Sequence, residues 1–334
     1  MIFKNYYNFN PAAPIKKIYL PESKPGKARI VESMPLFKFT NKQKKVIIDV
    51  LEQTWGFQID AITWERVQSS LQNMSIDWEL ETTLTESWQT FGDTMTGAMS
   101  NSAYVAGSSM AGDITALIDT SFYFDAGAPA LVEFLQNEVG ELIVEMSSQQ
   151  IGAIRLAIQN HFKYGHTAKF TKGAMEKAVT LTEREAEAVF SRYIKFYEEN
   201  FKRFYNSGLL EADAAKRADS IAMREMDRYF RQVKRRRVDR IYQTELSRVK
   251  GIADRQAMSQ AIDQNKISRA VATWRKTNYR DNWKSSDMYD GRWIDIASGE
   301  DFSKYGTPDP TTMISFYFPS EINEQCVTEY DVWR

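Results

Sequence analysis

Cysteine and histidine are nearly absent from this chain of 334 residues, which contains one Cys and two His. A single Cys excludes an intramolecular disulfide, so we expect Cys326 to be a small buried apolar residue and not a nucleophile. We expect His161 and His166 to be ordinary surface or helix-capping residues. A structural zinc site needs about four nitrogen or sulfur ligands, so none is expected.

Long apolar runs are missing as well. No stretch reaches about 18 uninterrupted apolar residues, and the first residues lack the apolar run of a signal peptide. We therefore expect a soluble protein of a reducing compartment, with no membrane partner. The motifs G-x-S-x-G, G-K-S/T, H-E-x-x-H and C-x-x-C are also absent. The sequence predicts that the protein is not an enzyme and has no cofactor and no small-molecule substrate.

The net charge of −1 hides blocks of opposite sign. Residues 1–50 carry a net charge of +7 and residues 51–160 carry −13, whereas residues 161–260 carry +8 and residues 261–334 carry −3. Blocks of this size indicate that the parts face different partners or face one another. The length and the 43% of hydrophobic residues are enough for two or three domains with buried cores.

The patterning predicts a mainly α fold, an elongated helical body with a small C-terminal α+β domain. Residues 1–40 contain five of the nine prolines and many lysines, which is typical of an extended basic arm. Residues 41–125 are expected to form an N-terminal helical region, and residues 126–265 a helical core with an Arg-rich helix. Residues 266–334 are expected to form the α+β domain.

Apolar residues at helical spacing predict most of the elements. Residues 92–112 are rich in Gly, Ala and Ser, and they allow either a closely packed helix, which we favour, or a mobile connector. Thr182 and Glu185 form a capping box. The first expected helix begins at residue 41. The other expected helices cover residues 62–71, 78–91, 131–146, 151–161, 183–205 and 212–237. The expected strands cover 271–273, 293–296, 313–318 and 327–332.

The helix expected over 212–237 has a basic side and an apolar side. At 100° per residue, the basic side lies about 180° to 240° from the apolar one. The apolar side consists of Ala218, Ala222, Met226, Tyr229 and Val233. We define the Arg ridge as Arg217, Arg224, Arg228, Arg231 and Arg235, thickened towards its C-terminal end by Lys234, Arg236, Arg237 and Arg240.

The Arg ridge allows three interpretations. Its steps of about 5 to 6 Å can follow a phosphate backbone, which would give non-specific, salt-sensitive binding to double-stranded DNA. The arginines can instead pair with an acidic surface of this chain or of a partner, or simply be solvated. No base-reading motif is present, so any binding to DNA should be independent of its sequence.

The N-terminal arm allows two interpretations, contact with packaged DNA or docking on another protein. Aromatic side chains among its lysines favour docking, because aromatic residues anchor in pockets. The residues expected to bind the partner are Tyr6, Tyr7, Phe9, Lys16, Lys17 and Tyr19.

Short motifs follow one another in a distinctive order in the last part of the chain. They are Trp274-Arg275-Lys276-Thr277, Arg280-Asp281-Asn282-Trp283, Asp290-Gly291-Arg292-Trp293-Ile294, and Pro319-Ser320-Glu321-Ile322-Asn323 with Cys326. Two further motifs precede them, Leu181-Thr182-Glu183-Arg184-Glu185-Ala186 and Arg240-Ile241-Tyr242-Gln243-Thr244-Glu245. This order resembles the phage Mu F-like minor head protein family over roughly residues 120 to 330.

The resemblance implies a minor capsid protein of a tailed phage, inside the head near the portal, that contributes to head morphogenesis and to DNA packaging or delivery. Portal and other capsid proteins would be its partners. The motif residues expected to have structural roles are Thr244, Glu245, Trp274, Asp281, Asp290, Gly291, Glu321, Asn323 and Cys326. Thr244 is expected to cap a helix, and Glu245 to neutralise Arg240 or Arg248.

The chain departs from the family pattern where many members carry Cys or His after the D-x-R-V element and in the terminal motif. Here those positions read Lys284-Ser285-Ser286-Asp287 and Glu324-Gln325-Cys326. Two other functions stay open. One is a toxin-like or nuclease-type effector enzyme that carries a Mu F-like domain, and the other is a structural adaptor without DNA contact.

Overall fold

The computed structural model describes residues 20–21, 27–31, 41–118, 120–276, 293–296 and 326–333. The chain divides into two compact units. The first unit consists of Met1–Lys45, Gly97–Gln136 and Arg240–Arg334, and the second of Val46–Thr96 and Asn137–Asp239.

The described part of the chain is mainly α-helical, as the apolar spacing predicts. Its helices are α1 (Asn41–Asp60), α2 (Trp64–Gln72), α3 (Trp78–Ile118), α4 (Pro129–Tyr164), α5 (Ala168–Ala178), α6 (Glu183–Asn206) and α7 (Glu211–Asp263). None of these helices is long and apolar enough to span a lipid bilayer.

Local sequence signals determine several helix ends. Pro129 is the first residue of α4. A backbone N–H at this position has no partner within the helix, so the missing N–H of proline costs no hydrogen bond. The Thr182 hydroxyl accepts a hydrogen bond from the Glu185 N–H, and the Glu185 carboxylate accepts one from the Thr182 N–H, so the predicted capping box is present. Gly165 and Gly208 adopt φ values of +64° and +89° just after α4 and α6, a conformation that favours glycine.

Two helices continue where the sequence analysis expected an interruption or an end. Residues 92–112 lie inside α3, which confirms the helical interpretation of this small-residue segment. The polar residues 147–150 do not interrupt α4, because Gln150 occupies a core position between Met146 and Ile154. The expected separate helices over 131–146 and 151–161 are therefore one helix.

A buried polar network fixes the core of the second unit. The Gln150 side chain accepts a hydrogen bond from Trp88 Nε1 (3.1 Å) and donates to Gln58 Oε1 (2.7 Å) and to the Val179 carbonyl (3.1 Å). Gln58 donates in turn to Ser87 Oγ (2.6 Å). Because each bond joins a different part of the chain, the network sets the register of α1, α3 and α4 within this unit.

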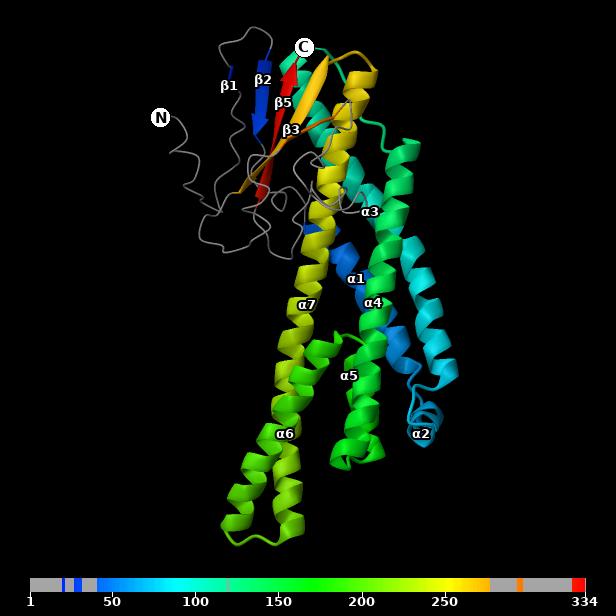
Figure 1. The fold of residues 1–334 in the computed structure, drawn as a ribbon, viewed down its shortest axis with the longest axis vertical. Helices are drawn as coiled ribbons and strands as arrows, with labels where there is room; N and C mark the ends of the chain where they lie inside the picture. The colour runs from blue at the N-terminus through cyan, green and yellow to red at the C-terminus, as the bar shows by residue number, and fades with distance from the viewer. Residues whose placement is uncertain are drawn as a thin grey trace. The chain divides into compact units, whose positions relative to one another are not determined.

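α6 and the first turns of α7 form an antiparallel pair in the second unit (Figure 1). The short connection over 207–210 brings Tyr193 of α6 against Asp219 of α7, and the Tyr193 hydroxyl donates to the carboxylate at 2.7 Å. This pair presents the Arg-rich part of α7.

The described strands belong to the first unit, and each of their pairings is antiparallel. β5 (Cys326–Trp333) lies between β2 (Lys27–Val31) and β3 (Arg269–Lys276), as Figure 1 shows, and the order is β1-β2-β5-β3-β4. The outer strands are β1 (Leu20–Pro21) and β4 (Trp293–Asp295). The expected strand over 313–318 lies outside the described residues, and the small C-terminal α+β domain stays a prediction.

Candidate nucleic-acid interface

One side of α7 is buried in the second unit and the other carries the Arg ridge. Ala218, Ala222, Met226 and Val233 are buried, as the apolar spacing predicts. The arginines of the ridge proper, from Arg217 to Arg235, are all exposed. With a rise of about 1.5 Å per residue, these 18 steps extend over about 27 Å.

The exposed arginines have few partners among the described residues. Among the residues that the structure describes, Arg217, Arg224, Arg231 and Arg235 make no ion pair. Arg228 lies 3.5 Å from the Glu225 carboxylate on the same helix, a surface contact that contributes at most about 1 kcal/mol. The guanidinium groups of the ridge are therefore available to an external anion.

The residues that thicken the ridge have different surroundings. Arg236 is exposed and makes no ion pair within the described part of the chain. The Lys234 ammonium lies 2.6 Å from the Glu52 carboxylate of α1 and 5.6 Å from the centre of the Trp55 ring. Lys234 therefore binds an acidic residue of its own unit, which fits the second interpretation of the ridge at this position.

Arg237 does not belong to the exposed surface of the Arg ridge. Its side chain is only 7% exposed, and its two terminal nitrogens donate to Glu185 Oε2 (3.2 Å) and Gln149 Oε1 (3.0 Å). A guanidinium held in this way by α6 and α4 cannot reach a phosphate. Arg240 belongs to the first unit, is half-buried and already interacts with other groups of the protein.

The family-like motif residues lie partly within the described regions. Thr244 lies inside α7, so the prediction that it caps a helix is wrong, because the helix continues unbroken from residue 211 to 263. Glu245 is buried, and its carboxylate lies 3.8 Å from the Arg248 guanidinium, one of the two pairings expected. The backbone of Trp274 pairs opposite Thr328, and that of Cys326 opposite Lys276.

The remaining predicted site residues lie outside the described regions. They are Tyr6, Tyr7, Phe9, Lys16, Lys17 and Tyr19 of the arm, and Asp281, Asp290, Gly291, Glu321 and Asn323 of the motifs. Within the residues that are described, no three His, Cys, Asp or Glu side chains are grouped closely enough to hold a metal ion.

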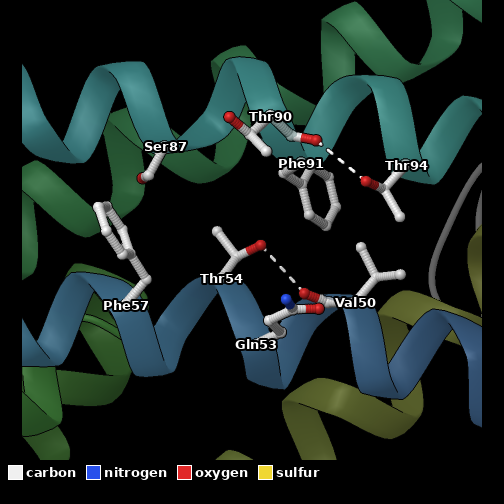
Figure 2. A pocket seen from close by; sticks show the side chains of 8 residues that line it. All are labelled: Val50, Gln53, Thr54, Phe57, Ser87, Thr90, Phe91 and Thr94. Atoms are coloured by element: carbon white, nitrogen blue, oxygen red, sulfur yellow. Dashed lines mark hydrogen bonds between the residues drawn. The ribbon is translucent and has the colours of Figure 1, made fainter.

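A groove with a volume of about 220 Å³ lies between α1 and α3 in this unit. Figure 2 shows Phe57 of α1 and Phe91 of α3 among the side chains that line it. The hydroxyls of Thr54 and Thr94 donate to carbonyls of their own helices, at 3.0 and 3.2 Å. With these hydrogens already donated, the groove offers few polar contacts and no charge, so it adds nothing to a nucleic-acid interface.

Neither α5 nor the cluster of aromatic residues around it was predicted from the sequence. The Thr167 hydroxyl accepts a hydrogen bond from the Phe170 N–H, which is the ordinary signal of a helix start. Tyr193 and Tyr197 stand four residues apart on α6, so their shared side of the helix was also visible in the sequence.

Comparisons with protein-family models, with curated proteins and with solved structures find no match to this chain.

Proposed function

We propose that the protein is a minor head protein of a tailed phage that contacts double-stranded DNA non-specifically through the Arg ridge. The exposed, largely unpaired arginines from Arg217 to Arg235 are the observation that supports it. The motif order of the C-terminal part supports the place near the portal and the small α+β domain. In this proposal the protein works by binding and assembly and has no catalytic step.

The geometry of the ridge suits a phosphate backbone better than a base edge. Five arginines over about 27 Å present one positive group about every 7 Å on average, on a single continuous helix. Guanidinium groups bind phosphate oxygens with two parallel N–H donors, and such contacts carry no sequence information. Each phosphate that is neutralised releases counterions and makes binding weaker as salt rises.

A structural adaptor without DNA contact is the second candidate. It is favoured by the ion pairs of Lys234 with Glu52 and of Arg237 with Glu185, which show basic residues of α7 binding acidic groups of the same unit. In that case the exposed arginines would dock on an acidic surface of a capsid protein.

A salt series of duplex binding separates the two candidates. The purified protein, an Arg228→Glu/Arg231→Glu variant and a control variant, Arg184→Glu/Lys202→Glu, would be titrated with a random-sequence duplex by fluorescence anisotropy. The control makes the same change in net charge on the exposed side of α6. If all five ridge arginines contact phosphates, the slope of log K against log salt is about −4.5, and loss of two contacts reduces it by about 1.8.

We expect the ridge variant to bind the duplex weakly with a flattened slope, and the control to keep the slope of the unmodified protein. Absence of binding at low salt would refute the DNA contact and favour the adaptor. Equal losses in the two variants would show that net charge matters and the ridge does not.

A further inference from the structure

A large cleft opens in the second unit, on a different side of α7 from the Arg ridge. Its volume is about 970 Å³, and it is lined by the residues around the end of α4, by α5, α6 and the first turns of α7, with Trp64 of α2. This volume is at the upper end of the range of small-molecule pockets, about 300 to 1,000 Å³.

Helical spacing brings the lining residues to the cleft. Lys169, Gly173 and Glu176 of α5 follow one another at four and three residues, and Lys216 and Asp219 of α7 are three apart. Residues three or four apart share one side of a helix. On α7, Asp219 lies about 200° around the helix from Arg217, so the cleft and the ridge use different sides of the same helix.

Aromatic rings form one continuous wall of the cleft. The imidazole of His166 lies against the Phe170 ring with 4.1 Å between centres and 34° between planes. Phe170 contacts Tyr193 at 4.5 Å, and Tyr193 is stacked on Tyr197 at 6.0 Å. The polar groups of the wall are the hydroxyl of Tyr193, which donates to Asp219, the hydroxyl of Tyr197 and the imidazole of His166.

Charged groups also line the cleft. Among the described residues, the Asp219 carboxylate accepts one hydrogen bond, from Tyr193, and can accept more. Lys169 and Lys216 are exposed and, among the described residues, pair with no carboxylate, whereas Lys172 pairs with Glu176. Burial, and secondarily the charge of His161, lower the pKa of His166, which keeps its imidazole neutral at pH 7.

We propose that this cleft binds a guanine nucleotide. The flat base stacks on one ring of the wall, Phe170 or Tyr193, whose planes differ by 48°, as unpaired bases stack on aromatic side chains. The adjacent N1–H and N2–H donors of guanine face the Asp219 carboxylate, which can only accept. The phosphate is bound by Lys169 or Lys216. The base can come from a free mononucleotide or from single-stranded nucleic acid.

Gly173 provides a variant that blocks the cleft without disturbing the fold. A Cβ at Gly173 would meet no atom within 4 Å, so a leucine has room, and leucine favours a helix more than glycine does. Asp219→Asn replaces the acceptor and keeps an oxygen for Tyr193. Lys202→Ala is the control, an exposed lysine that does not line the cleft.

Calorimetric titrations with GMP, AMP, inorganic phosphate and a thymidine oligonucleotide with one central guanine test the proposal. We expect GMP to bind saturably and about tenfold more tightly than AMP, as one good pair of base contacts discriminates. Asp219→Asn should remove this preference, Gly173→Leu should abolish binding, and Lys202→Ala should change nothing. Tighter binding of the oligonucleotide than of GMP would identify single-stranded nucleic acid as the source of the base.

Three results would overturn the proposal. They are the absence of saturable binding to both GMP and the oligonucleotide, binding of phosphate as tight as that of GMP, and unchanged GMP binding in Gly173→Leu. Since the Arg228→Glu/Arg231→Glu variant leaves the cleft intact, failure here is distinguishable from failure of the duplex contact.

Discussion

Replacement of Arg237 by methionine tests whether this arginine belongs to the core of the second unit. The methionine keeps most of the apolar stem but removes the two hydrogen bonds to Glu185 and Gln149. Breaking a buried ion pair lowers the free energy of unfolding by about 3 to 5 kcal/mol. Because the Glu185 side chain is 15% exposed and keeps its bond from the Thr182 N–H, we expect the lower end, about 3 kcal/mol.

Urea unfolding followed by circular dichroism measures this difference. Arg236→Met is the matched control, because Arg236 is adjacent and exposed, and it should change stability by less than about 0.5 kcal/mol. Adding Glu185→Gln to Arg237→Met removes the uncompensated charge and should recover part of the loss. A change below about 0.5 kcal/mol in Arg237→Met would refute the buried pair, as would a flattened salt slope for duplex binding in a variant that stays folded.

Two further predictions concern the second unit. Gln150→Leu leaves the Trp88 N–H and the Gln58 and Val179 oxygens without their hydrogen bonds. Urea unfolding should therefore show that the free energy of unfolding falls by about 3 kcal/mol or more. A fall below about 1 kcal/mol would contradict the network. The pKa of His166 is lowered in the folded state by burial, so its contribution to stability is present above its unfolded pKa of about 6.5 and is lost as pH falls. Unfolding measured from pH 7.5 to 5 should show a weaker pH dependence in His166→Phe than in the unmodified protein, and equal slopes would contradict this.

The sequence predicted those features of the fold that depend on residues close together in the chain. The start of α6 at the Thr182 capping box and the position of the Arg ridge opposite the buried side of α7 both follow from residues within a few positions of one another. The prediction that the Arg-rich helix ends at residue 237 is wrong, since α7 continues to Asp263. Buried residues such as Val238 and Leu246 lie beyond it, on a different side of the helix from Ala218 and Val233.

The rest depends on pairs that are distant in sequence. Gln150 is polar but buried, because its partner Gln58 lies 92 residues away and satisfies its amide. Arg237 cannot be distinguished from Arg236 by sequence, because its partner Glu185 lies 52 residues away. The cleft was missed for the same reason, since residues from several helices come together only in the folded unit.

Chemical modification of arginines read by mass spectrometry tests the DNA contact most directly. The protein would be treated with phenylglyoxal with and without a random-sequence duplex at low salt, and the modification of each arginine compared. We predict protection of Arg217, Arg224, Arg228, Arg231 and Arg235, with Arg184 and Arg203 of α6 unchanged. Equal protection of all exposed arginines, or protection of none, would contradict the account.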